Sequence, residues 1–254
     1  MSRRENKKVV LLIVEGQSEN IALFSALSRL FDQIDPEIEL ILADVIEEGN
    51  HIYGDITSKD GVYPENIIGL INKLILVPRM NEKRLMKKDI IAVIQITDTD
   101  GVYVSDDLIR ENPESEKAEY GEDYISIDRI EKITERNRNK RENIDFLTEQ
   151  TVIKVQTKAV PYRIYYHSCN MDHCICGERN LSSRQKTDAA RDFYGKYFLL
   201  EDFIDFYNQE GFGAVGMNYG ESWEYIRKGN HSLDRFTNMN ILIDDIKDGL
   251  FSAR

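Results

Sequence analysis

Residues Val9 to Gly16 read VVLLIVEG, six apolar residues followed by a glutamate and a glycine. An unbroken apolar run of this length is typical of a strand buried on both faces, as central parallel strands are. Glu15 and Gly16 end the run. The next segment predicts a helix, with Ser18 as its N-cap and apolar residues at helical spacing from Ile21 to Leu30.

The same order of elements continues along the chain. Ile38 to Ile46 predicts a second strand, Asn66 to Val77 a helix, and Ile90 to Ile96 a third strand that is again continuously apolar. Tyr162 to Tyr166 predicts a fourth strand. Alternating strands and helices favour an α/β fold, in which a doubly wound parallel sheet is flanked by helices.

The last part of the chain predicts helices only. Their expected ranges are Arg184 to Tyr197, Glu201 to Gln209, Glu221 to Lys228 and Thr237 to Leu250. We therefore divide the chain into an α/β domain over residues 1–180 and a helical C-terminal lobe over 181–254, packed on the same domain. Residues 106–158 are polar and charge-rich, and we interpret them as an insertion that is partly helical around Ile125 to Glu149.

Composition limits the class of protein. The formal net charge of −12 argues against a generic nucleic-acid binder, because phosphate contacts favour a basic surface. Acidic residues that hold cations add to this negative count, however, and the bound cations reverse the local sign. The three cysteines lie within one short segment, which argues against a disulfide framework. No apolar run is long enough to span a bilayer, so we expect a cytoplasmic protein without a membrane partner.

Acidic residues stand where two of the predicted strands end. Glu15 follows the first apolar run, and Asp98 and Asp100 follow the strand that begins at Ile90. Ligands of open α/β sheets bind at the carboxyl ends of the strands. Alternate residues of an extended stretch point the same way, so both aspartates are expected to face one ion. Magnesium and manganese prefer carboxylate oxygens, and Asp-x-Asp-Gly is also common in ordinary turns.

At these residues the chain resembles the Toprim superfamily, which includes topoisomerases, bacterial primases and the OLD-type nucleases. The resemblance lies in VVLLIVEG and, from Ile90 to Gly101, IIAVIQITDTDG. It implies that Glu15 is the catalytic glutamate and that Asp98 and Asp100 are catalytic metal ligands. It also implies a Toprim-like sheet and a Mg²⁺ or Mn²⁺ cofactor.

The OLD-type nucleases are the nearest variant in pattern. The resemblance adds Glu19, four residues after Glu15, as a ligand of a second metal ion, and Asp172 as a candidate acid from a later strand. Small proteins of this kind are often encoded beside an ATPase and act in anti-phage defence. An ATPase partner is therefore expected from the resemblance, and assembly into a homo-oligomer stays open.

Basic residues provide candidates for contact with nucleic acid. They are Arg136, Arg138, Lys140, Arg141 and Lys186. A solvated helix face is the alternative for the first four. Two further motifs are weak: the cysteines and histidines between residues 167 and 176 lack the spacing of a zinc site, and the Gly-x-Gly-x-x-Gly string that begins at Gly211 follows no predicted strand.

These patterns favour a metal-dependent nuclease that cleaves DNA or RNA. The alternative is a non-catalytic module that binds a metal ion or a nucleotide and acts through a protein partner, which the net charge favours. A phosphatase with Asp98 as its nucleophile is a further alternative. Such enzymes usually carry the nucleophile at the end of the first strand, where this chain has Glu15.

Overall fold

The fold is described from a computed structural model, which covers residues 7–47, 50–52 and 55–252. Its centre is a five-stranded sheet in the order β2-β1-β5-β10-β9. The strands are β1 (Lys8–Ile13), β2 (Ile38–Ala43), β5 (Ile90–Asp98), β9 (Val152–Val155) and β10 (Lys158–His167). Strands β1, β2, β5 and β10 run parallel to one another, and β9 pairs antiparallel with β10 at the edge of the sheet. The predicted α/β class is therefore confirmed.

Strands β1 and β5 lie at the centre because they are apolar on both sides. Residues Val9 to Leu12 of β1 are fully buried, and so are nearly all side chains of β5. The register sets Leu12 beside Ile94 of β5 and beside Leu42 of β2. Both central strands therefore end at the same edge of the sheet, together with the end of β10, where His167 pairs with Asp98.

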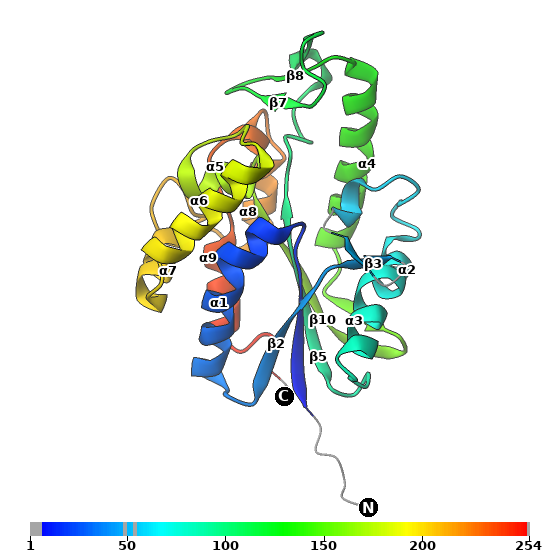
Figure 1. The fold of residues 1–254 in the computed structure, drawn as a ribbon, viewed down its shortest axis with the longest axis vertical. Helices are drawn as coiled ribbons and strands as arrows, with labels where there is room; N and C mark the ends of the chain where they lie inside the picture. The colour runs from blue at the N-terminus through cyan, green and yellow to red at the C-terminus, as the bar shows by residue number, and fades with distance from the viewer. Residues whose placement is uncertain (1–6, 48–49, 53–54, 253–254) are drawn as a thin grey trace, which may run out of the picture.

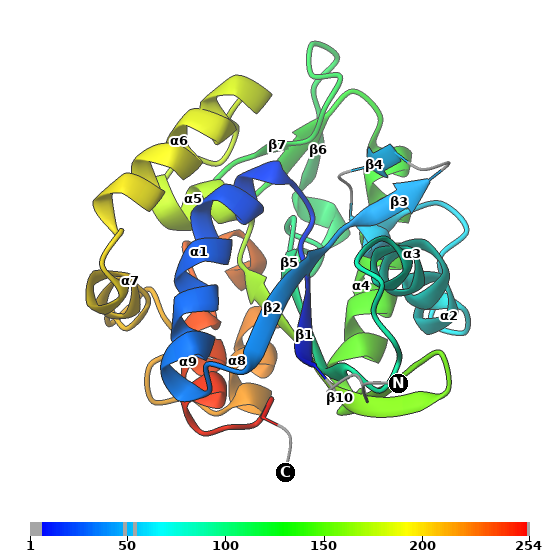
Figure 2. The same cartoon turned by 60° about the horizontal axis from the view of Figure 1, so that its bottom comes forward.

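Helices cover both faces of the sheet (Figures 1 and 2). On one side lie α1 (Gln17–Ile34), α5 (Met171–Cys176), α6 (Ser183–Lys196), α7 (Leu200–Tyr207), α8 (Tyr219–Ile226) and α9 (Met239–Lys247). On the other side lie α2 (Ile67–Ile71), α3 (Val77–Glu82) and α4 (Ile130–Thr148). Apolar side chains of the sheet, α1 and the C-terminal helices form one continuous core.

The structure refines several predicted boundaries. Helix α1 begins at Gln17 with Gly16 as its N-cap, so Ser18 is not the cap. The helix expected from Asn66 to Val77 is α2, a π-helical turn η2 (Asn72–Leu76) and α3, which continues to Glu82. The second predicted strand divides into β2 and the short β3 (Val45–Glu47), which pairs with β4 (Asn50–Ile52).

The insertion contains a small sheet as well as a helix. Strands β6 (Ile109–Glu111), β7 (Glu119–Tyr120) and β8 (Ile125–Ile127) form this sheet, and α4 follows it. The remaining short elements are the 3₁₀ turns η1 (Ile56–Ser58), η3 (Asp106–Leu108) and η4 (His231–Leu233). The small sheet lies beyond the carboxyl ends of the central strands in Figure 1, with its own small apolar cluster. None of the described helices is long and apolar enough to cross a membrane.

Candidate metal centre

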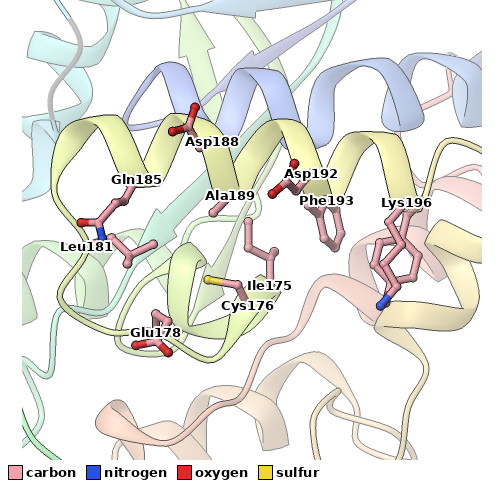
Figure 3. A pocket seen from close by; sticks show the side chains of 11 residues that line it. Ile175, Cys176, Glu178, Leu181, Gln185, Asp188, Ala189, Asp192, Phe193 and Lys196 are labelled. Atoms are coloured by element: carbon pink, nitrogen blue, oxygen red, sulfur yellow. The ribbon is translucent and has the colours of Figure 1, made fainter.

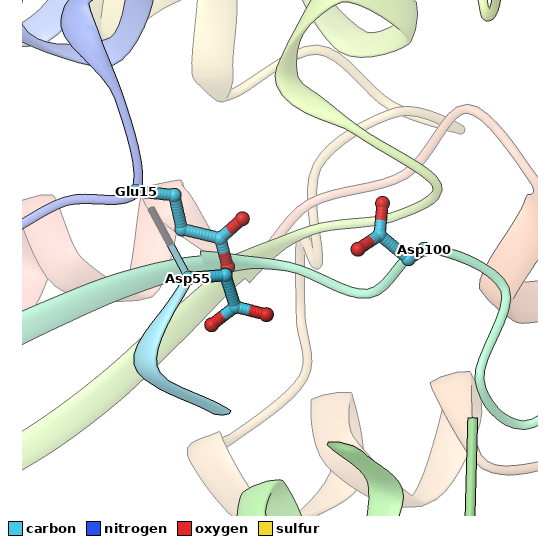
Figure 4. Close-up of side chains that lie close together, drawn as sticks. All are labelled: Glu15, Asp55 and Asp100. Carbon is cyan, nitrogen blue, oxygen red and sulfur yellow. The ribbon is translucent and has the colours of Figure 1, made fainter. Parts of the chain in front are cut away.

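Three carboxylates converge at the carboxyl ends of β1 and β5 (Figure 4). Glu15 follows β1, Asp100 follows β5, and Asp55 comes from the segment just before η1. One oxygen of each lies within 4.8 Å of those of the others. Their side chains are 16%, 10% and 21% exposed for Glu15, Asp55 and Asp100. This inner cluster of three carboxylates can hold a metal ion, because hard oxygen ligands at this spacing suit a divalent cation.

Asp55 is the member of the inner cluster that sequence reasoning missed. It lies in a turn-rich segment, where an aspartate before a short helix is ordinary capping chemistry. The structure shows that capping role directly: one carboxylate oxygen accepts hydrogen bonds from the Thr57 amide at 2.7 Å and from its hydroxyl at 2.6 Å. The other oxygen, Oδ2, is left for the cluster. No local pattern in the sequence distinguishes these two uses.

The ammonium of Lys140 lies among the three carboxylates. Its Nζ is 2.7 Å from Asp55 Oδ2, 2.7 Å from Asp100 Oδ2 and 3.4 Å from Glu15 Oε1, and its side chain is 0% exposed. The structure thus places Lys140 at the inside of the site, as the internal cation of the cluster. Contact with a phosphate at the surface would require Lys140 on the solvated face of α4, and it does not lie there.

Glu15 is held by the neighbouring strand end. Its Oε1 accepts hydrogen bonds from the hydroxyl of Thr97 and from the backbone N–H of Asp98, the latter at 2.9 Å. Burial, together with the negative charge of Asp55, raises the pKa of Glu15 well above its ordinary value, and the nearby ammonium of Lys140 offsets only part of this. Glu15 is therefore equipped to hold a proton at a higher pH than an exposed glutamate does.

The turn from Asp98 to Gly101 separates the two aspartates of the Asp-x-Asp motif. Asp100 adopts a positive φ of 49°, so the chain is not extended there and the expected alternation fails. Asp98 instead accepts a hydrogen bond from the backbone N–H of Met171, at 2.9 Å. Asp98 is accordingly not one of the three carboxylates of the inner cluster, and its role as a ligand of the same ion stays a prediction.

Contacts with the turn after β10 fix this conformation. The Asp100 amide donates to the carbonyl of Cys169 at 2.7 Å, and the Cys169 amide donates to the Thr99 hydroxyl at 2.9 Å. Gly101 also has a positive φ, 65°, and a Cβ there would lie 2.8 Å from Leu233 and 2.9 Å from Ile125. A side chain at this position would be strained by the left-handed backbone, so glycine suits the turn that carries Asp100.

A second acidic group adjoins the first. Burial raises the pKa of Asp98 well above its ordinary value, and the negative charges of Glu15 and Glu19 add to this effect. Burial also raises the pKa of Glu19. The positive charge of Lys186 lowers this pKa, and the negative charge of Asp172 raises it. Lys186 forms an ion pair with Asp172 at 2.9 Å. Glu19, Asp98 and Asp172, predicted as ligands, thus share one electrostatic environment with Lys186, although they do not form a compact triad of ligand atoms.

The basic residues that were predicted to contact nucleic acid lie in different parts of the structure. Arg136 donates to the carbonyl of Asp100 at 3.1 Å and lies 3.8 Å from its carboxylate. Arg141 donates weakly to the Val102 carbonyl, at 3.4 Å, and Arg138 is exposed. Lys186 is partly exposed beside Asp172. Contact of these residues with nucleic acid stays a prediction.

The cysteines and histidines between residues 167 and 176 are largely structural. Cys169 and Cys174 are buried and Cys176 is exposed. Burial lowers the pKa of His167 to about 3 and that of His173 to about 4, so both are neutral at physiological pH. Within the described part of the chain, the inner cluster is the only group of three such ligands that converges. The string from Gly211 to Gly216 lies in the loop between α7 and α8.

A separate cavity of about 370 Å³ lies between α5 and α6 (Figure 3). Its apolar wall includes Ile175, Leu181 and Phe193, and no member of the inner cluster lines it.

Comparison with known proteins gives no relative: no family model, curated protein or solved structure matches the chain. The resemblance to Toprim proteins therefore stays a prediction that rests on the residues quoted for it.

Proposed function

We propose that the chain is a magnesium- or manganese-dependent nuclease that hydrolyses phosphodiester bonds of DNA or RNA. The observation that carries this proposal is the convergence of Glu15, Asp55 and Asp100 at the carboxyl ends of two central parallel strands. That edge is where open α/β sheets bind their ligands. The Toprim-like placement of Glu15 and Asp100 supports the same assignment.

The donor set fits a divalent cation. Its oxygens are hard ligands, and one oxygen of each carboxylate lies within 4.8 Å of those of the others. A magnesium ion bound there would supply positive charge for phosphate oxygens and for activating water. Asp172 Oδ1, which is buried without a hydrogen-bond partner, adds an available oxygen in the adjoining acidic group.

The chain's own residues supply the remaining chemistry. Hydrolysis adds water to phosphorus, breaks the bond from phosphorus to one bridging oxygen, and delivers a proton to that leaving oxygen. Glu15, with its raised pKa, is suited to move this proton. Arg136, which lies 3.8 Å from the Asp100 carboxylate and is partly exposed, would place positive charge near the negative charge that develops on the phosphate.

One observation favours a second candidate, the non-catalytic binding module. Lys140 already contacts all three carboxylates, so the cluster has an internal cation without any metal ion. A module of this kind would bind a metal ion or a nucleotide and act through a partner protein, for which an ATPase remains the expectation drawn from the resemblance.

Cleavage assays separate the two candidates. Purified protein is incubated with plasmid, single-stranded DNA and transfer RNA, each with Mg²⁺, Mn²⁺ or EDTA. We expect cutting of at least one substrate with Mg²⁺ or Mn²⁺ and none with EDTA. The same assay on Glu15→Gln, with the exposed Glu210→Gln as its control, should show loss in the first variant only. Absence of cutting by wild type under all conditions would contradict the nuclease and leave the binding module.

A further inference from the structure

A polar cavity of about 530 Å³ opens beside Asp100. One wall comes from the small sheet of the insertion, at Lys117 to Tyr120. The other wall comes from the loop between α5 and α6 and from the first turn of α6, at Arg179 to Lys186. Because Asp100 belongs both to this cavity and to the inner cluster, a ligand in the cavity lies next to the candidate metal centre.

Three cations line the cavity: Lys117, Arg179 and Lys186. Lys186 has a carboxylate partner in Asp172, whereas Lys117 and Arg179 form no ion pair with any residue that the structure describes. The Nε of Arg179 is also buried without a hydrogen-bond partner. In a chain of net charge −12, unpaired cations in one cavity point to an anionic ligand.

The walls of the cavity are held in place before any ligand binds. The side chain of Asn180 makes two hydrogen bonds to the backbone of Tyr120, one from the Tyr120 N–H at 2.8 Å and one to its carbonyl at 3.0 Å. Asn170, which is buried, donates to the carbonyl of Arg179 at 2.8 Å. Helix α6 begins at the rim with Ser182 as its cap, and the N-terminus of a 14-residue helix favours negative charge.

We propose that this cavity binds one nucleotide of a single-stranded polynucleotide, with the adjoining phosphate directed to Asp100 and the inner cluster. The inference rests on the proposed nuclease function and specifies its substrate as a single strand or a frayed end. The volume of the cavity lies within the usual range for pockets that enclose a small ligand.

The recess of the inner cluster argues against an intact duplex. Its three carboxylates are only 10–21% exposed, and the small sheet and α6 rise on either side of the opening. A phosphate has to enter this recess to reach them. A nucleotide in a duplex can do so only after it leaves its base pair and its stack, which has a free-energy cost that a single strand avoids.

Binding without cleavage tests the proposal directly. Fluorescence anisotropy in EDTA compares a labelled 12-nucleotide single strand with the same sequence as a duplex. The proteins are wild type, Lys117→Ala, Arg179→Ala and, as the matched control, Arg191→Ala, whose side chain is exposed on α6 away from the cavity. We expect each cavity variant to bind the single strand about tenfold more weakly than wild type. The slope of log affinity against log salt concentration should fall by about one in each cavity variant, and the control should bind like wild type.

Each outcome has a distinct meaning. Equal affinity for duplex and single strand, or cavity variants that bind like wild type, would overturn the cavity assignment while metal-dependent cutting left the nuclease intact. Binding of a nucleoside monophosphate at the cavity without binding of the single strand would replace the polynucleotide with a free nucleotide and overturn the proposal. If no strand binds and none is cut, both the cavity and the nuclease fail. Lys117 is exposed, so its variant tests binding without a folding defect.

Discussion

Replacing Lys140 by methionine should lower the free energy of unfolding of the metal-free protein by about 3–5 kcal/mol. The side chain is completely buried, and its ammonium lies 2.7 Å from Asp55 and from Asp100. Removing it leaves buried carboxylates without their internal cation, and the attraction that offset their desolvation is lost. Chemical denaturation in EDTA measures the loss, with the exposed Lys132→Met on the same helix as control.

The same variant should respond more strongly to metal than wild type does. The ammonium and a divalent ion use the same oxygens, so Lys140→Met is expected to bind Mn²⁺ more tightly and to regain stability when Mn²⁺ is added. Adding Asp100→Asn to Lys140→Met should recover part of the lost stability in EDTA, because one uncompensated charge is removed with the cation. A Lys140→Met protein as stable as wild type in EDTA would show that the ammonium does not stabilise the cluster.

Replacing Asp100 by asparagine should reduce the rate of phosphodiester cleavage by about 10³-fold, equivalent to ~4 kcal/mol of transition-state stabilisation. The change keeps the size of the side chain and removes the charge that contacts Lys140 and lies near Arg136. Asp100 also lines the proposed nucleotide cavity. Single-turnover cleavage with Mg²⁺ measures the rate, and the exposed Asp106→Asn is the control from the same segment.

A variant that cuts as fast as wild type would contradict the assignment of Asp100 to the catalytic centre. If only substrate affinity changed, Asp100 would act in binding. Thermal denaturation of both variants distinguishes either result from a folding defect.

The central strands were predictable because their sequences are apolar on both sides. Residues Val9 to Val14 and Ile90 to Ile96 each form a strand of the buried sheet, as their patterns indicated. Since parallel strands end at one edge, the meeting of Glu15 with the Asp98–Asp100 segment followed from the same argument. The fold class and the position of the candidate site could therefore be inferred without the structure.

The composition of the inner cluster could not be inferred in the same way. Asp55 lies far along the chain from both motifs and looks locally like a cap, so only tertiary structure brings it to Glu15. The burial of Lys140 depends on how α4 packs against η1 and β10, which the charged pattern of that helix does not reveal. The left-handed conformation of Asp100 likewise comes from contacts with the turn after β10.

The structure therefore changes the account from an Asp-x-Asp pair to a three-part cluster with an internal cation. Asp55, which the sequence did not indicate, lies beside Glu15 and Asp100, and Asp98 lies in the adjoining acidic group with Glu19. This difference makes Asp55 the most informative residue, because neither the motif nor the resemblance pointed to it.

The most direct test is to count bound Mn²⁺ in wild type and in Asp55→Asn by titration followed with electron paramagnetic resonance, in which free Mn²⁺ gives the signal. The exposed Asp60→Asn, from the same segment, is the matched control. We predict that wild type and Asp60→Asn bind Mn²⁺ and that Asp55→Asn binds it at least about tenfold more weakly. Equal Mn²⁺ binding by Asp55→Asn and wild type, or no binding by wild type, would contradict a metal centre built on Glu15, Asp55 and Asp100.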